Sequence, residues 1–306
     1  MSEQIATRRL LIGGNQFLIG YQQQQEWAWL IATAFFLGKV GGGVFMISFF
    51  TDFKLGALVG VLLVGVGKTT AHLLYLGRPE RFLRAVWGWK TSWISRGILA
   101  MIAFCTLGAL YVARYVHVTF VPQGLADACG IAAVVFAFVL MFYDGFVLRA
   151  SKGVPLWDSY LMPLLMLFYA TLGGIALTLA LEVLDGADTT RRLEWLGIGL
   201  LAVNAALLGI FLLDSRLRHV AAELAVTLLT RDRLARVFVS AVVIGIGGTL
   251  VLAGISVATH DRVVLPIAAV SDSVGQFFLF FAILRAGIHA PIRSLPLRGI
   301  RPGVAT

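Results

Sequence analysis

Apolar residues are arranged along this chain in long, nearly unbroken runs rather than in the stripes or alternation of a water-soluble protein. Each run is about 20 residues long, the length that an α-helix needs to cross a hydrocarbon layer roughly 30 Å thick. Charged residues, prolines or polar clusters bound the runs. The pattern predicts an all-α integral membrane protein with eight transmembrane helices, near residues 27–50, 55–76, 93–115, 127–148, 160–182, 194–213, 237–258 and 263–285.

These spans divide the chain into three parts. Residues 1–26 form a polar, glutamine-rich segment, residues 27–285 one eight-helix membrane domain, and residues 286–306 a basic C-terminal tail. The first segment lacks the short apolar core and cleavage site of a secretory signal, so we expect the first apolar run to be a retained span. An even number of spans places both termini on the same side of the membrane.

Composition supports a membrane protein and excludes a globular cytosolic enzyme. Of the 306 residues, 59% are apolar and only 13% are charged, and the mean hydropathy is +0.88. The net charge of +9 is typical of basic cytoplasmic loops, so no nucleic acid partner is expected. Cys105 and Cys129 stand singly in apolar surroundings, and we therefore expect no zinc or iron–sulfur centre on this chain.

Lysine and arginine residues are distributed unevenly between the two sides of the predicted bundle. Of the 25, 18 fall on the side of the termini and 5 on the opposite side, counting the charges at the ends of the spans. Basic residues accumulate in the cytoplasmic loops of membrane proteins. The asymmetry therefore predicts cytoplasmic termini and a cytoplasmic face made of the longer loops.

The remaining two lysines, Lys39 and Lys68, lie deep inside the first and second spans. A charged side chain at that depth costs a few kcal/mol unless it is paired or hydrated. Asp144 in the fourth span and Asp272 in the eighth are the candidate partners. The pattern permits two interpretations: a structural ion pair or snorkelling lysine, or a group on a proton path or beside a quinone or anion cavity.

His72 is the only histidine that falls inside a predicted span, and it shares one helix face with Lys68, four residues earlier. Membrane cytochromes b ligate haem with pairs of facing histidines, so no haem is expected.

Four strings of residues near the ends of the second to fifth spans combine polar, aromatic and glycine residues in an unusual way. The strings are His72-Leu-Leu-Tyr-Leu-Gly-Arg-Pro79, Ser92-Trp-Ile-Ser-Arg-Gly97, Tyr143-Asp-Gly145 and Lys152-Gly-Val-Pro-Leu-Trp157. They resemble the NrfD family, the polysulfide-reductase-type membrane subunits of molybdopterin oxidoreductase complexes. The glycines at 41–43 also resemble the glycine-rich first span of that family. The likeness covers most of residues 27–180, and the later spans match only in number and length.

This resemblance implies a quinone-reactive subunit of the bacterial inner membrane that uses ubiquinone or menaquinone and is surrounded by membrane lipid. It also implies docking on an iron–sulfur subunit, which in turn holds a catalytic subunit with molybdenum or tungsten bound by two pterins. The primary substrate, such as formate or a sulfur compound, would then react on another chain.

The predicted helix ends bring candidate quinone ligands to one face of the bundle. The resemblance supports Tyr143 best and His72 next as hydrogen-bond donors to a quinone oxygen, with Gln25 and Trp27 beside them. Family members often carry a histidine near the start of the first span, where this chain has Gln25 and Glu26. The predicted proton-relay residues are Asp144, Glu26, Lys39 and Lys68.

The loop at residues 77–92 is rich in arginine and tryptophan, which are enriched at energetically important positions of protein interfaces. We expect it to contact the iron–sulfur subunit through Arg78, Arg81, Arg84, Trp87 and Trp89.

Two other functions are compatible with the sequence. One is a secondary transporter or ion-translocating subunit that uses the buried charges Lys39, Lys68, Asp144 and Asp272. Internal inverted symmetry would favour it, and none is visible in the sequence. The other is a passive membrane anchor, in which Tyr143 and His72 can be replaced without loss of turnover.

Overall fold

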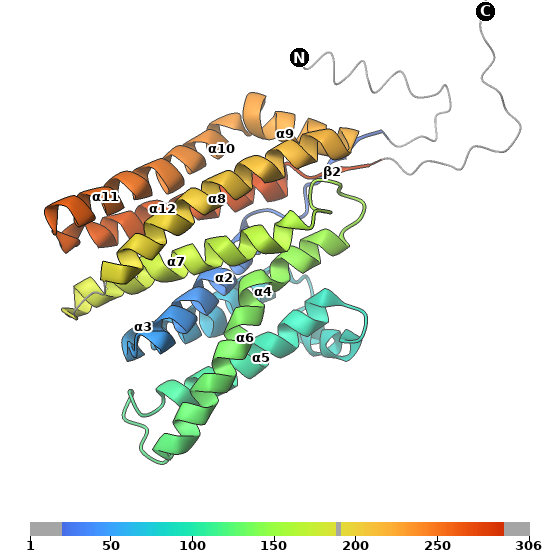
Figure 1. The fold of residues 1–306 in the computed structure, drawn as a ribbon. Helices are drawn as coiled ribbons and strands as arrows, with labels where there is room; N and C mark the ends of the chain where they lie inside the picture. The colour runs from blue at the N-terminus through green and yellow to red at the C-terminus, as the bar shows by residue number, and fades with distance from the viewer. Residues whose placement is uncertain (1–19, 188–190, 291–306) are drawn as a thin grey trace, which may run out of the picture.

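The computed structural model describes residues 20–187 and 191–290, which form a bundle of long helices (Figure 1). Within these residues, eight helices are long and apolar enough to cross a membrane, so the prediction of an all-α, eight-span protein is confirmed. The spans are Trp29–Phe50 (α2), Lys54–Tyr75 (α3, η1 and α4), Trp93–Val112 (α5), Gln123–Ala150 (α6), Leu161–Asp185 (α7), Arg191–Arg218 (α8), Ala235–Thr259 (α10, η3 and α11) and Arg262–Arg285 (η4 and α12).

The second and seventh spans are not uniform α-helices. Each contains a short π-helical segment, η1 at Leu63–Lys68 and η3 at Val243–Gly248, between flanking α-helices. The flanking segments are α3 (Lys54–Leu62) and α4 (Thr69–Tyr75) in the second span, and α10 (Ala235–Val242) and α11 (Thr249–Thr259) in the seventh. Such wide turns are frequent at functional sites, and η1 ends at Lys68, one of the two deeply placed lysines.

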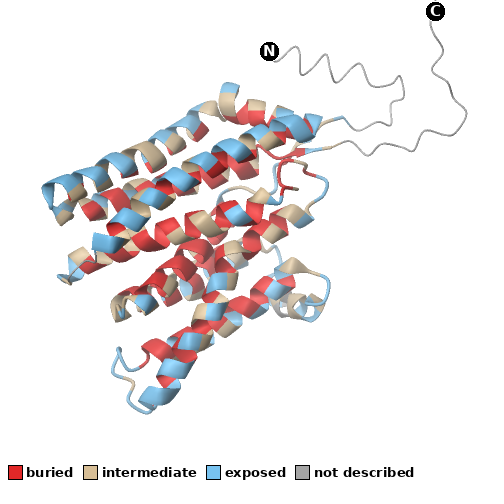
Figure 2. Ribbon diagram, in the orientation of Figure 1, coloured by how far each residue is buried: buried red, intermediate tan, exposed pale blue. Residues whose placement is uncertain are grey.

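The first span, α2, lies in the middle of the bundle and contacts α3, α6, α7 and α12. Its glycines allow other backbones to approach closely, because a Cβ atom at Gly43 would overlap the carbonyl oxygen of Ala170 and one at Gly42 would lie 2.9 Å from that of Ala137. Figure 2 shows buried residues concentrated along these inner helices and exposed residues along the outer faces of α10 and α11. The exposed apolar side chains of the outer faces are suited to contact lipid.

The two ends of the described chain meet at one end of the bundle. Strand β1 (Gln22–Gln23) pairs antiparallel with strand β2 (Ile288–His289). Next to this pair, the buried Gln24 donates hydrogen bonds from Nε2 to the carbonyl oxygens of Trp27 and Leu284. The segment before α2 and the segment after α12 (Leu265–Arg285) are thereby fixed together. Both lie at the same end of the bundle, as expected for an even number of spans. We call this the near end, and the other the far end.

Two short helices occur in loops for which the sequence analysis predicted no helix. The 12-residue α9 (Val220–Arg231) follows α8 and packs against α8, α10 and β2 at the near end (Figure 1). Its apolar face, including Val226 and Leu229, is buried. A search for 20-residue apolar runs does not detect a short amphipathic helix of this kind. The second, η2 (Pro79–Gly88), is a 3-10 helix in the loop after the second span.

Candidate functional site

A cavity of about 300 Å³ lies at the near end of the bundle, between α2, α4, α5 and α6, and η2 covers part of it. This volume is at the lower end of the range for small-molecule sites. Most of its wall is apolar or aromatic, and its polar side chains come from α4, from α6 and, for Arg78, from the loop after α4. The lining residues are Trp27, Ile31, Phe35, His72, Tyr75, Leu76, Arg78, Phe82, Ala85, Ile94, Gly97, Ile98, Met101, Tyr143, Asp144 and Val147.

One wall of the cavity is built from packed aromatic rings. Trp27 stacks on Trp157 with ring centroids 5.1 Å apart and an interplanar angle of 16°, and meets Phe35 edge-on at 6.1 Å. Trp157 is itself held by a hydrogen bond of 3.3 Å from Nε1 to the carbonyl oxygen of Ile283. The Trp27 ring therefore presents a fixed flat surface to the cavity.

Tyr143 also lines the cavity, where the absence of a side chain at Gly97 leaves room for its ring. A Cβ atom at position 97 would overlap Cε2 of Tyr143 and lie 2.5 Å from Cδ2. The tyrosine ring thus packs directly against the backbone of α5, and only glycine permits this arrangement. The Ser92–Gly97 string contributes to the site through this close contact.

Below the cavity, Lys68 and Asp144 form a salt bridge in which neither side chain is exposed to solvent. Nζ of Lys68 lies 3.2 Å from Oδ2 and 3.4 Å from Oδ1 of Asp144, and donates a third hydrogen bond to the carbonyl oxygen of Ala34. The same Nζ lies 4.9 Å from the centroid of the Tyr143 ring. Gly38 leaves space for the lysine, since a Cβ atom there would lie 2.6 Å from Nζ.

His72 lies one turn after Lys68 and lines the same cavity. Within the described residues, no hydrogen bond to the protein holds its ring, so both ring nitrogens are available to a ligand. The site therefore combines a flat apolar slot with a phenol, an imidazole and a buried ion pair along one edge. This arrangement suits a planar ligand whose polar atoms need hydrogen bonds and protons.

The structure places the other candidate ligands and relay groups in three different environments. Trp27 lines the cavity, whereas Gln25 and Glu26 are exposed and do not line it. Their neighbour Gln24 is the buried glutamine, and it fixes the chain rather than facing the cavity. Lys39 is buried on the other side of α2, between α7 and α12, where its Nζ lies 3.3 Å from the centroid of the Phe280 ring.

The arginine- and tryptophan-rich loop combines cavity-lining and exposed residues. Arg78 lines the cavity and is exposed, and Arg84, Trp87 and Trp89 are exposed. The side chain of Arg81 lies outside the described part of the chain. Arg96, at the start of α5, fixes the end of the loop by donating to the carbonyl oxygens of Trp89 and Lys90.

Sequence reasoning missed three residues that shape the cavity. Gly97 and Trp157 lie in strings that we had identified, but their roles depend on contacts with Tyr143 and Trp27. Gly38 lies outside these strings, and its role is to leave space for Lys68 on another helix. Among the described residues, no group of three His, Cys, Asp or Glu side chains is arranged to hold a metal ion.

Comparison with known proteins adds to this geometry. A family model described as "Polysulphide reductase, NrfD" matches residues 18–291. The chain is also 26% identical, over 200 residues, to a sulfite dehydrogenase subunit from Allochromatium vinosum. That match covers 60% of this chain and 61% of the relative.

Proposed function

Because the chain belongs to the polysulphide reductase NrfD family, we propose that it is the membrane subunit of a redox complex and exchanges electrons between membrane quinone and attached redox subunits. The observation that carries this proposal is the near-end cavity, in which aromatic walls converge on Tyr143, His72 and the Lys68–Asp144 pair. Quinone is the substrate that this combination suits best.

The chemistry of a quinone matches the cavity in three respects. Its flat ring fits an apolar slot beside Trp27, and its two carbonyl oxygens accept hydrogen bonds that Tyr143 and His72 can donate. Reduction to a quinol adds two electrons and two protons, and the reverse reaction releases them. Ubiquinone and menaquinone share these requirements, so either suits the site.

Protons need groups that can hold them beside the cavity. Asp144 lines the cavity and is bound to Lys68, so a proton held by Asp144 passes to a ligand oxygen without leaving the site. Glu26 is exposed at the near end, where it can exchange protons with solvent. We assign the relay at the cavity to Asp144 and Lys68, and place Glu26 at its outer end. Lys39 lies apart from this route.

The attached subunits are proposed to be an iron–sulfur protein and, beyond it, a catalytic subunit with molybdenum or tungsten bound by two pterins. The loop around η2 supports this assignment, because the same segment covers the cavity and exposes Arg84, Trp87 and Trp89. A partner docked there would lie next to the quinone. The name of the relative favours a sulfur compound such as sulfite as the primary substrate, rather than formate.

We further propose that the chain lies in a bacterial inner membrane with both termini in the cytoplasm. The support is the excess of lysine and arginine on the side of the termini. The near end, with its cavity and docking loop, is then the cytoplasmic end.

The proposal is tested by replacing the tyrosine hydroxyl in the complex purified from its native membrane. Tyr143→Phe should lower quinone-linked turnover by about tenfold or more, since one hydrogen-bond donor to a reacting oxygen is lost. Activity of the attached enzyme with a soluble dye should persist. Tyr160→Phe, an exposed tyrosine at the same end, serves as the control and should change neither activity.

Unchanged quinone turnover in Tyr143→Phe would contradict the assignment and favour a passive anchor. The composition of the purified sample provides a second test. Iron, molybdenum or tungsten and quinone are expected to co-purify with the chain. A lone protein without metal-bearing partners or quinone would favour an ion transporter instead.

A further inference from the structure

A second polar site lies within the bundle, separated from the quinone cavity by α2. Its centre is Lys39, whose Nζ is buried and has no hydrogen-bond partner among the described residues. The nearest groups are the rings of Phe280 and Tyr169, whose centroids lie 3.3 and 5.6 Å from Nζ. An aromatic face attracts an ammonium group but accepts none of its three hydrogen bonds in full.

Two further polar atoms without partners lie around the same helix junction. The hydroxyl of Tyr169 and Oε1 of Gln276 are buried and unpaired, so three of the eight such side-chain atoms in the described residues belong to this site. Helices α2, α7 and α12 meet here, since a Cβ atom at Gly173 would lie 3.1 Å from both Nε2 of Gln276 and Cγ2 of Val40. Clustered buried polar atoms of this kind are usually satisfied by internal water.

The site also contains a carboxylate. Asp272 is buried one turn before Gln276 on α12, and its Oδ2 accepts a hydrogen bond of 2.7 Å from Nε2 of Gln276. The titratable groups that face Lys39 are Tyr169 from α7, Asp272 from α12 and, across α2, the Lys68–Asp144 pair. Of these groups, the carboxylates of Asp272 and Asp144 attract the positive charge of Lys39. A carboxylate, an amide and an ammonium group are therefore buried at one helix junction.

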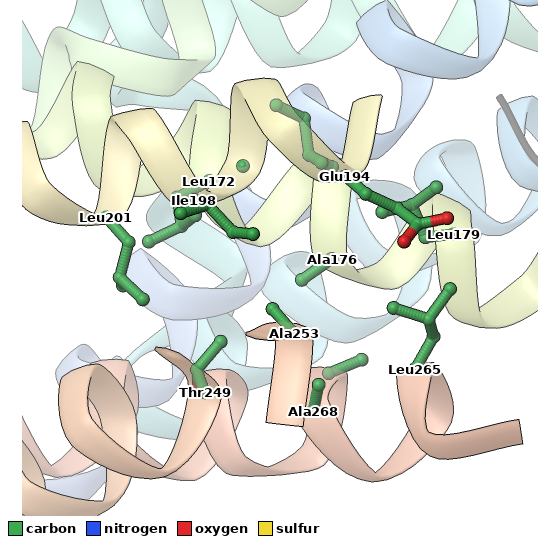
Figure 3. Close-up of a pocket in the computed structure, with 13 residues that line it drawn as sticks. Leu172, Ala176, Leu179, Glu194, Ile198, Leu201, Thr249, Ala253, Leu265 and Ala268 are labelled. Carbon is green, nitrogen blue, oxygen red and sulfur yellow. The ribbon is translucent and has the colours of Figure 1, made fainter. Parts of the chain in front are cut away.

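A narrow cleft lies on the far-end side of this site. It lies between α7, α8, α11 and α12 and has a volume of about 30 Å³, which is enough for a water molecule. Figure 3 shows Glu194, Thr249 and Ala268 around it. Ala268 lies on α12 one turn before Asp272, so the inner end of the cleft approaches the polar site.

The cleft contains polar groups that suit bound water. Oγ1 of Thr249 is buried and has no hydrogen-bond partner in the part of the chain that the structure describes. Glu194 accepts a hydrogen bond of 3.2 Å from Ser256 and lies 3.9 Å from Nε of Arg262. A water molecule in the cleft could therefore hydrogen-bond to the hydroxyl group of Thr249 and the carboxylate of Glu194, whereas the rest of the wall is apolar.

We propose that Lys39, Tyr169, Gln276 and Asp272 enclose bound water and form a proton-exchanging site that communicates with the far end through the cleft at Glu194. The step is a proton transfer without redox change. Water carries a proton to the Asp272 carboxylate, which becomes a neutral carboxylic acid, and the reverse transfer returns the proton to water. The proposal goes beyond the quinone site and does not depend on it.

Water density is the first test. A high-resolution cryo-electron microscopy map of the purified full chain should show at least one water molecule within hydrogen-bond distance of Lys39 Nζ, and another beside Thr249 in the cleft. A map in which the space around Nζ is dry would overturn the proposal.

Proton exchange is tested by infrared spectroscopy of the same protein in lipid nanodiscs. A protonated-carboxyl band should respond to bulk pH, shift in deuterium oxide, disappear in Asp272→Asn and change position in Lys39→Met. Ser215→Ala is the control, because Oγ of Ser215 is also buried without a hydrogen-bond partner among the described residues but lies near the C-terminal end of α8. The proposal fails if no band exchanges with deuterium, or if Asp272→Asn leaves the spectrum unchanged.

Thermal unfolding separates a functional lysine from a structural one. Lys39→Met should raise the melting temperature, because it removes a buried ammonium group that has no hydrogen-bond partner among the described residues. A lower melting temperature with an unchanged carboxyl band would show that Lys39 only packs, and would overturn the proposal. Quinone binding, titrated on the same samples, should be unchanged, so the outcome for this site is independent of the outcome for Tyr143.

Discussion

Lys68 and Asp144 form an ion pair inside the membrane-spanning bundle, with Nζ 3.2 Å from Oδ2 and both side chains withdrawn from solvent. The pair joins a π-helical segment of the second span to the fourth span at the base of the cavity. Each charge offsets the free-energy cost of burying the other, because an unpaired charge in a medium of low dielectric constant is strongly unfavourable. This relationship leads to a prediction about stability.

Replacing one member of the pair should destabilise the fold more than replacing both. Lys68→Met leaves an uncompensated carboxylate and should lower the free energy of unfolding by about 3–5 kcal/mol. The double variant Lys68→Met with Asp144→Leu should recover much of that loss. Thermal unfolding in nanodiscs, followed by tryptophan fluorescence, measures the difference.

The control for this cycle is the pair formed by Lys54 and Asp52, at the far end of the bundle. Nζ of Lys54 lies 2.8 Å from Oδ1 of Asp52, but the aspartate is exposed. Asp52→Asn should therefore change stability by no more than about 1 kcal/mol. A Lys68→Met variant as stable as the wild type would show that the buried pair does not act as argued.

Gly97 has no side chain that could contact a ligand, and we expect it to act by positioning Tyr143. Gly97→Ala would force the tyrosine ring away from α5, because the new Cβ atom overlaps Cε2 of the ring. Quinone affinity should fall by about tenfold, the effect of roughly 1.4 kcal/mol. Titration with a quinone analogue, followed by quenching of tryptophan fluorescence, gives the dissociation constant.

The matched control for Gly97→Ala is Gly199→Ala. Gly199 also lies within a spanning helix, but a Cβ atom there would meet no other atom within 4 Å. Affinity should be unchanged, and helix propensity should favour the folded state by up to about 1 kcal/mol. Equal affinity of Gly97→Ala and wild type would exclude a positioning role for Gly97.

The loop around η2 should be needed for assembly with the redox partner. Arg84→Glu together with Trp87→Ala changes exposed side chains that do not line the cavity. The pair of changes should weaken partner binding by about tenfold or more. Co-purification of iron with the tagged chain, measured at increasing salt concentration, reports the loss.

The control for this loop lies at the opposite end of the bundle. Arg192→Glu together with Trp195→Ala also removes an exposed arginine and an exposed tryptophan. Partner binding should persist in that variant. If both double variants retained iron equally, the partner would have to bind elsewhere on the chain.

The sequence was sufficient to predict the eight spans and to limit the charge partner of Lys68 to two candidates, Asp144 and Asp272. Each apolar run has the length of a membrane crossing, and Asp144 is one of two acidic residues placed deep within the predicted spans. Lys68 and His72 were expected on one face because they are four residues apart on a helix. That geometry depends only on local spacing, and the structure places His72 in the cavity wall and Lys68 against the lining residue Asp144.

The direction in which Lys39 points could not be predicted in the same way. The first span is apolar around its whole circumference, so no amphipathic pattern indicates which side faces which neighbour. The structure places Lys39 toward α7 and α12, whereas its neighbour Gly38 faces Lys68. Such an assignment requires knowledge of which helices pack together, which one sequence does not provide.

The same limit applies to the polar residues just before the first span. Gln24, Gln25 and Glu26 are consecutive polar residues, and their order gives no reason to bury one and expose the others. The structure buries Gln24 because it bridges the carbonyl oxygens of Trp27 and Leu284, which are 257 positions apart in the chain. Long-range contacts of this kind also define the role of Gly97.

The orientation of the bundle in the membrane can be tested with single cysteines at its two ends. In a background without Cys105 and Cys129, His289→Cys lies in β2 at the near end and Gln123→Cys lies at the start of α6 at the far end. Both positions are exposed. The excess of basic residues on the near side predicts that His289→Cys is cytoplasmic and Gln123→Cys is external.

In intact cells, a membrane-impermeant maleimide should label Gln123→Cys and leave His289→Cys unmodified until the cells are lysed. The inverse pattern would place the cavity and the docking loop outside the cytoplasm. It would also require the redox partners to be exported, because the loop around η2 and the cavity it covers lie at the same end of the bundle as β2. The two labelling patterns therefore decide in which compartment the electron partner must be sought.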